Sequence, residues 1–122
     1  MLISPEVLAR VVADWWVKQP SLDIFIEKTN VLASFFDRSS FTEVTEFQQQ
    51  LFHRHLLDAV RIRLETTYAR PVSVGCDYHP DVLLRDCLAL SGIPDLYLPE
   101  KTKLLIWNDK IEAWPQRKQI FP

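Results

Sequence analysis

A chain of 122 residues has the usual length of one domain, and 48% hydrophobic with 25% charged residues is the composition of an ordinary globular protein. This composition excludes an intrinsically disordered chain, and the net charge of -2 argues against a strong nucleic-acid binder, which usually carries a basic excess on one face. We therefore expect a single domain, residues 1–122, that needs neither a metal nor a disulfide to fold.

The first two predicted elements are helices with apolar residues at helical spacing. Ser4 is a suitable N-cap and Pro5 suits the first helical position, so the first helix is predicted to begin there and to run to about Lys18. Pro20 interrupts the pattern. The periodicity then resumes and predicts a second helix that continues to Phe36.

A third helix is predicted after the polar loop at residues 37–40. The spacing Ser40-x-x-Glu43 is that of a capping box and predicts the start of the helix, which runs to about Thr67 and is the longest element. Its main apolar stripe, which predicts the core face, consists of Val44, Phe47, Leu51, His55, Ala59 and Ile62. Supplementary apolar positions are Phe52, Leu56 and Val60.

The chain changes character after this helix, because a short β-branched segment at Val72–Val74 predicts a strand. A fourth helix follows, with Pro80 expected at its first position and Asp81 favourable to its dipole. Gly92 can adopt the left-handed conformation that ends a helix.

The C-terminal segment contains the clearest local signal in the chain. Residues 103–107 and 110–114 are separated by Asn108 and Asp109, which tolerate positive φ and favour a tight β-hairpin turn. Residues 119–121 are predicted as a short edge strand or a packed tail. The order of helices, strand, helix and hairpin indicates an α+β fold.

The chain also carries signals about its compartment. It has no basic, apolar leader and no run of about 20 apolar residues that could span a bilayer. Its two cysteines, Cys76 and Cys87, are eleven positions apart, and Cys87 lies within an apolar helical pattern, so free thiols are expected. These features predict a cytoplasmic protein with no membrane partner.

Cys76 is the candidate nucleophile, because a cysteine between a strand and a helix N-terminus can have a lowered pKa. A phosphatase-type loop would need an arginine six positions later, where the chain has Val82. A pair with His79, or with His53 or His55, leaves open the alternative of a small thiol-dependent enzyme or redox protein.

No catalytic residue, cofactor or metal site is predicted. Cys76, His79 and Cys87 lack the paired spacing of structural zinc sites, and two glycines cannot form a glycine-rich phosphate loop. Strand, helix and hairpin resemble part of a winged-helix domain, which needs a second helix before its wing. A winged-helix nucleic-acid binder is therefore a further alternative, and nucleic acid is not the expected partner.

The four tryptophans are candidates for interface residues, because tryptophan is enriched at binding hot spots. Trp107 and Trp114 flank the hairpin, and a two-stranded ribbon cannot cover both of its faces. Trp15 and Trp16 point about 100° apart on a helix, so one of them is expected at the edge of the core. The predicted interface residues are Trp107, Trp114, Asp109, Glu112 and Trp16.

Several short motifs carry a resemblance, namely Asp77-Tyr78-His79-Pro80-Asp81, Ser91-Gly92-Ile93, Pro99 with Lys101-Thr102, and Ala13-Asp14-Trp15-Trp16. In these the chain resembles a group of small, uncharacterised bacterial and phage accessory proteins with a D-Y-x-P-D helix start, an A-G-I helix end and a P-x-K-T segment before a final hairpin. It departs from their glycine-rich ending, having Trp114-Pro115-Gln116-Arg117 instead.

This resemblance implies a protein of a phage or mobile element that covers a site on a larger protein, as anti-defence inhibitors and toxin-immunity proteins do. The absence of a catalytic motif and the abundance of aromatic residues agree with that mode of action. The leading hypothesis is therefore a non-enzymatic binding protein whose partner is a larger protein. The sequence does not identify that partner or the oligomeric state.

Overall fold

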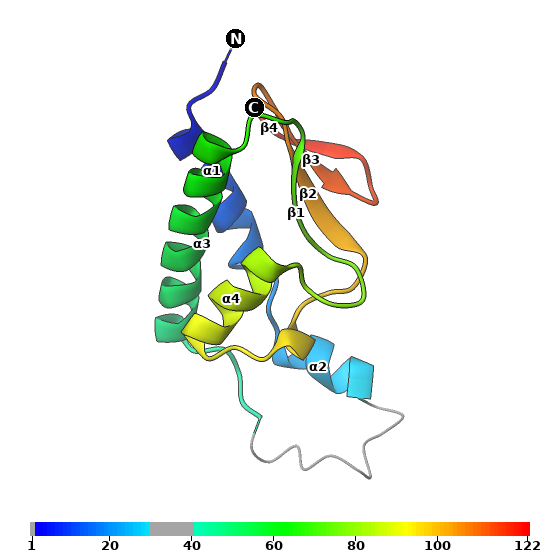
Figure 1. Ribbon diagram of the computed structural model, residues 1–122. Helices are drawn as coiled ribbons and strands as arrows, with labels where there is room; N and C mark the ends of the chain where they lie inside the picture. The colour runs from blue at the N-terminus through cyan, green and yellow to red at the C-terminus, as the bar shows by residue number, and fades with distance from the viewer. Residues whose placement is uncertain (1, 30–40) are drawn as a thin grey trace.

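The structure is a computed structural model that describes residues 2–29 and 41–122. Its helices are α1 (Pro5–Trp16), α2 (Leu22–Thr29), α3 (Glu46–Thr66), α4 (Val82–Ser91) and the 3-10 turn η3 (Asp95–Tyr97); its strands are β1 (Val72–Cys76), β2 (Thr102–Ile106), β3 (Ile111–Trp114) and β4 (Lys118–Phe121). The strands form an antiparallel sheet in the order β1-β2-β3-β4. The helices α1, α3 and α4 lie on one side of it (Figure 1). The predicted α+β fold is confirmed.

The first helix starts as expected, and α2 begins at Leu22, where helical periodicity resumes after Pro20. The Ser4 hydroxyl accepts a hydrogen bond from the Val7 N–H at 3.3 Å, with Pro5 at the start of α1, and α1 ends at Trp16, two residues before the predicted end. The predicted continuation of the second helix to Phe36, the loop at residues 37–40 and the Ser40 cap lie outside the described residues.

The predicted start of α3 near Ser40 is wrong, because the helix begins at Glu46. Its capping box is made by Thr45 and Gln48: the Thr45 hydroxyl accepts from the Gln48 N–H at 3.1 Å, and the Gln48 side chain accepts from the Thr45 N–H at 2.9 Å. The preceding residues are held outside the helix by the Tyr97 hydroxyl, which donates to the Thr42 carbonyl at 2.7 Å. This tertiary contact with η3 explains why α3 begins later in the sequence than the periodicity predicts.

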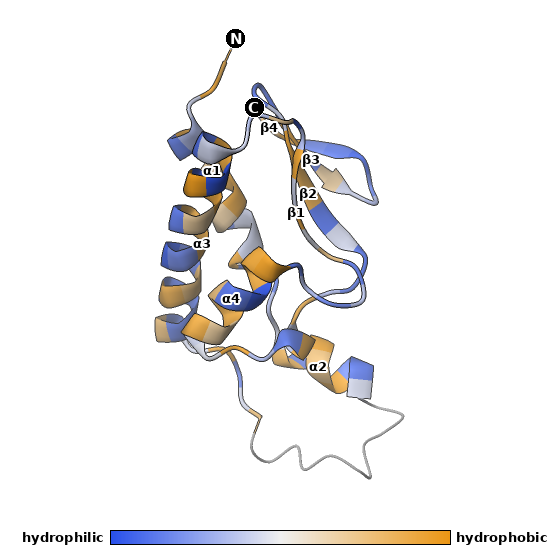
Figure 2. Cartoon of the chain, viewed as in Figure 1, coloured by the Kyte–Doolittle hydropathy of each residue, from blue (hydrophilic) through white to orange (hydrophobic). Residues whose placement is uncertain are grey.

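The core face of α3 also differs from the predicted main stripe. Phe47 and Ile62 are 67% and 50% exposed, although both were expected in the core. The buried residues of α3 instead form one i, i+4 row, which is Phe52, Leu56, Val60 and Leu64. Apolar residues alternate with polar ones along the visible side of α3 (Figure 2), so packing against α1 and α4, rather than periodicity, decides which of the apolar residues are buried.

Helix α4 is defined by strong signals at both ends. Asp81 is its N-cap and accepts a hydrogen bond from the Leu84 N–H at 2.9 Å. Pro80 lies before the helix, in a bridge with the end of β1, so its predicted place at the first helical position is wrong. Gly92 ends the helix with φ of 71°, and the buried Ile93 follows, as predicted.

The sheet has one buried face, which packs on the helices. The hairpin predicted around Asn108 and Asp109 is confirmed, because β2 and β3 pair on either side of this turn. The predicted edge strand is β4, which begins at Lys118. Side chains alternate along the strands as expected for a sheet with one covered face. The buried ones are Val72, Val74, Cys76, Leu104, Ile106, Ile111 and Ala113.

Candidate functional site

The face of the sheet turned away from the helices carries both hairpin tryptophans. The strand register places Lys103 opposite Trp114. At the other end of the hairpin, the Trp107 N–H donates to the Lys110 carbonyl at 2.9 Å. None of the described helices covers this face (Figure 1). We call the surface formed by Lys103, Leu105, Trp107, Lys110, Glu112 and Trp114 the outer face.

Each tryptophan of the outer face has basic side chains over its ring. Lys103 Nζ lies 5.8 Å from the centroid of the Trp114 ring, and Arg117 Cζ lies 4.6 Å from the same centroid. Lys110 Nζ lies 5.6 Å from the Trp107 centroid. At exposed sites, such cation–π contacts are worth about 0.5–1 kcal/mol each. These contacts restrain the rings and the cations in the free protein.

The charges of the outer face are paired at one end and unpaired at the other. Lys110 and Glu112 form an ion pair at 2.9 Å, and their hydrogen bond raises the pKa of Lys110 and lowers that of Glu112. By contrast, Lys103 and Arg117 form no ion pair with any described residue. The two cations beside Trp114 are therefore outside any ion pair, although the charge of Arg117 also contributes to the lowered pKa of Glu112.

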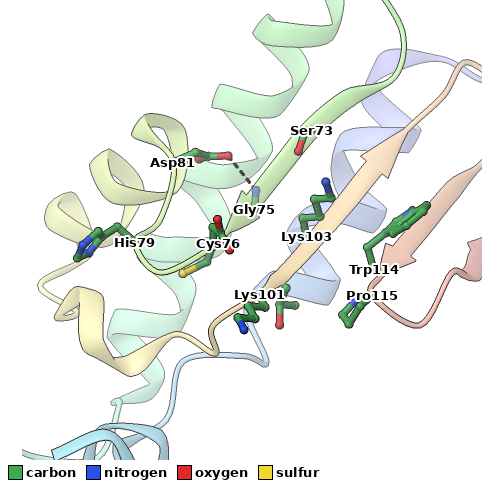
Figure 3. Close-up of a pocket in the computed structure, with 11 residues that line it drawn as sticks. Ser73, Gly75, Cys76, His79, Asp81, Lys101, Lys103, Trp114 and Pro115 are labelled. Atoms are coloured by element: carbon green, nitrogen blue, oxygen red, sulfur yellow. Dashed lines mark hydrogen bonds between the residues drawn. The ribbon is translucent and has the colours of Figure 1, made fainter.

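A cavity of about 500 Å³ opens beside this unpaired charge. Lys101, Lys103, Trp114 and Pro115 form part of its wall, together with residues from the end of β1 and the loop that follows (Figure 3). Its volume falls within the range of about 300–1,000 Å³ that is typical of ligand pockets. The cavity is thus large enough to take a side chain or a small group of side chains.

Asp81 fixes the wall of the cavity on the β1 side. One carboxylate oxygen accepts from the Gly75 N–H at 2.8 Å (Figure 3), and the other accepts from the Leu84 N–H at 2.9 Å. Both oxygens are therefore used by the backbone of the chain itself. Asp81 positions α4 against β1 and forms no ion pair with Lys101 or Lys103.

Two of the cations near the cavity have a backbone conformation that favours glycine. Lys101 has φ of 53° and Arg117 has φ of 54°. The left-handed region costs a residue with a side chain roughly 1–2 kcal/mol, a cost that glycine avoids. Lys101 Nζ also lies over an aromatic ring, 5.4 Å from the centroid of Tyr78. A long basic side chain is thus present at two positions where glycine would be less strained.

The structure does not give Cys76 the surroundings of a nucleophile. Its side chain is 2% exposed, and burial raises the pKa of the thiol. Within the described residues, the thiol makes no hydrogen bond to His79, His53 or His55, and His53 is bonded instead to Asp14 at 2.6 Å. A reactive thiol needs a lowered pKa and access to solvent. Cys76 and Cys87 are both free and buried, as expected for structural cysteines.

Burial raises the pKa of the Cys87 thiol to about 11, which predicts a loss of stability in alkali. An unfolded thiol titrates near pH 8.5, so above that pH the unfolded state binds fewer protons than the folded state. The free energy of unfolding should then fall by up to about 1.4 kcal/mol per pH unit until the folded thiol titrates. Urea unfolding at pH 7, 9 and 10 measures this, and Cys87→Ala should have the shallower slope. Equal slopes would contradict the expected pKa.

The structure places the five predicted interface residues in three different surroundings. Trp107, Trp114 and Glu112 lie on the outer face, half-buried, and Asp109 is exposed in the hairpin turn. The prediction for Trp16 is wrong, because its side chain is 0% exposed. It belongs to the i, i+4 row Leu8, Val12 and Trp16 that α1 buries. Trp15, which precedes it on α1, lies at the edge of the core.

The predicted interface residues do not include Lys101, Lys103 or Arg117, although Lys101 belongs to the motif formed by Pro99 and Lys101-Thr102. The register of the hairpin is enough to place Lys103 opposite Trp114, because both lie the same number of residues from the Asn108-Asp109 turn. Lys101 and Arg117 lie beside strand ends, where register gives no guide. Only the tertiary structure brings them to one cavity.

Comparison with known proteins gives no assignment: no family model matches the chain, and no curated protein or solved structure has significant similarity to it. Within residues 2–29 and 41–122, no three His, Cys, Asp or Glu side chains gather in a group that could hold a metal ion. In that same part of the chain, every helix is too short or too polar to cross a membrane.

Proposed function

We propose that this protein is a non-enzymatic binding protein that engages a larger protein through the outer face of its sheet. The observation that carries the proposal is the pair of tryptophans with cations stacked on them, on a sheet face that no described helix covers. Tryptophan and arginine are enriched at interface hot spots, because they bury a large surface with specific contacts. Covering a site on that larger protein, as an inhibitor or immunity protein of a phage or mobile element does, is the proposed mode of action.

The prior ordering of the outer face supports this role. A binding surface that must first immobilise its long side chains loses about 0.5–1.5 kcal/mol for each one. Here Lys103, Lys110 and Arg117 already rest on tryptophan rings. Much of that entropic cost has therefore been met in the free protein.

The distribution of charge along the outer face also favours a partner bound in one orientation. Unpaired cations lie at the Trp114 end, whereas the exposed Asp109 lies at the hairpin turn. Complementary charge contributes mainly to specificity and to the rate of association. A partner that presents negative charge to the Trp114 end and positive charge to the hairpin turn would therefore bind in preference to the same partner turned end to end.

The two alternative functions are less well supported. A thiol-dependent enzyme needs an accessible Cys76 with a lowered pKa, but the thiol is buried and its pKa is raised. A winged-helix domain needs two helices between its first strand and the wing. Between β1 and β2 the structure has α4 and the three-residue turn η3.

Site-specific photo-crosslinking in cells of the source organism tests the proposed function. Gln119 lies opposite Glu112 in the sheet, and Gln50 is also exposed but lies on α3. A photo-reactive residue at position 119 should capture a protein that the same residue at position 50 does not. The double variant Trp107→Ala, Trp114→Ala should then bind the purified partner at least about 30-fold more weakly, while its circular dichroism stays unchanged. Identical adducts from both positions, or no adduct from position 119, would reject the proposal.

A further inference from the structure

We infer that the cavity beside Trp114 is a binding site for carboxylate side chains, so that the partner presents an acidic segment to this end of the outer face. The partner class in this inference rests on the proposed function. The preference of the cavity for carboxylates is independent of the proposed function, because it can be measured with a simple peptide. Its support comes from charge, from backbone conformation and from the contacts of the aromatic rings.

The first argument is that the cations around the cavity are not paired with carboxylates. Lys101 and Lys103 line it, and Arg117 lies on Trp114, which also lines it. None of these three cations forms an ion pair with a described residue. The carboxylates of the lining are Asp81 and Asp77. Both oxygens of Asp81 accept hydrogen bonds from backbone N–H groups, and neither forms an ion pair with a lysine of the lining. The N–H donors of Lys101 and Lys103 are therefore not taken by the carboxylates beside them.

The second argument is that aromatic rings hold these cations without neutralising them. Lys101 lies over Tyr78, and Lys103 and Arg117 lie over Trp114. A cation held over a ring keeps its net charge and its free N–H donors, unlike a cation in an ion pair with a carboxylate. An arriving carboxylate would meet donors already in place, and an arginine can bind it through two parallel hydrogen bonds.

The backbone provides the third argument. Lys101 and Arg117 hold the left-handed conformation, which glycine adopts with less strain. Strained positions of this kind are concentrated at binding sites, where the side chain has a role that outweighs its conformational cost. Here two such positions place cations around the same cavity.

The same contacts favour an acidic protein segment over single-stranded nucleic acid. Proteins that bind single strands offer free aromatic faces for base stacking along a basic track. Here cations already lie over Trp107 and Trp114. The positive charge is also local, because Lys110 at the other end of the outer face is neutralised by Glu112. One or two carboxylates fit this site better than a run of phosphates.

Fluorescence anisotropy with labelled peptides tests the inference directly. A peptide of eight glutamates should bind the purified protein, and a peptide of eight glutamines should not. Lys103→Gln and Arg117→Gly should each weaken the binding of the glutamate peptide by about tenfold. Arg117→Gly suits the positive φ at that position, so it should not impair folding. Arg54→Gln removes an exposed cation from α3 and should leave binding unchanged.

Three results would overturn the inference: equal binding of the two peptides, an equal loss in Arg54→Gln, or tighter binding of an eight-residue oligothymidine than of the glutamate peptide. The last would reassign the cavity to nucleic acid. Failure of the proposed function is distinct, because crosslinking from Gln119 would then find no protein while the glutamate peptide still bound. If crosslinking finds a partner but the glutamate peptide does not bind, the inference alone fails.

Discussion

Replacing Trp16 by alanine is expected to lower the free energy of unfolding by about 4 kcal/mol, which is the loss typical of a large aromatic side chain removed from a core. Trp16 is fully buried and is one of the largest side chains in the core. Its ring meets that of Trp15 edge to face, with centroids 5.0 Å apart. The substitution removes these contacts and leaves a cavity between the helices and the sheet. Urea unfolding followed by circular dichroism measures the change.

Two further variants separate volume from the other properties of Trp16. Trp16→Phe keeps an aromatic ring and removes an indole N–H that is buried without a hydrogen-bond partner among the described residues, so it should cost less than half as much. Trp15→Ala, at the edge of the core, should also cost less than Trp16→Ala. A loss below about 1 kcal/mol in Trp16→Ala would contradict the buried position and restore Trp16 as a surface residue.

The parts of the fold that could be predicted from the sequence are those fixed by neighbouring residues. Gly92 ends α4 because the chain there needs a left-handed residue, and Asn108 with Asp109 forms a turn of two residues. Both signals act within a few positions and need no knowledge of the rest of the molecule. The C-terminal end of α4 and the hairpin turn therefore lie at the predicted residues, whereas α4 begins two residues after the predicted Pro80.

The parts that could not be predicted depend on distant contacts. Periodicity could not decide between Trp15 and Trp16, or between Phe47 and Phe52, because only the packing of the helices shows which side of each is covered. In the site, the position of the hairpin turn is enough to predict from the sequence that Lys103 lies opposite Trp114. It could not have shown that β1 lies alongside β2, and the cavity exists only because those two strands pair.

That pairing leads to the second large effect, because Gly75→Ala is expected to destabilise the protein by about 3 kcal/mol. Gly75 lies opposite Lys103 in the sheet, and a Cβ added to it would lie 2.3 Å from Lys103 Cβ and 3.0 Å from Lys103 Cα. Carbon atoms pack at about 3.5–4.0 Å, so β1 and β2 would have to move apart. Lys103 lines the cavity, so binding of the glutamate peptide should fall as well.

A double-mutant cycle with Lys103→Gly tests whether this clash is the cause. Removing Lys103 Cβ relieves the shorter contact but leaves Cα. Gly75→Ala should therefore lower the free energy of unfolding by at least about 1 kcal/mol less in the Lys103→Gly variant than in the unchanged protein. Gly92→Ala is the matched control: its added Cβ would meet only Gln48 Nε2 at 3.6 Å, and its cost comes from the positive φ of 71°. Lys103→Gly should leave the cost of Gly92→Ala unchanged. If the two alanine substitutions respond alike, the close approach of β1 and β2 does not explain why glycine is needed at position 75. If only Gly75→Ala is rescued, that glycine is what allows Lys103 to lie over β1 and reach the cavity.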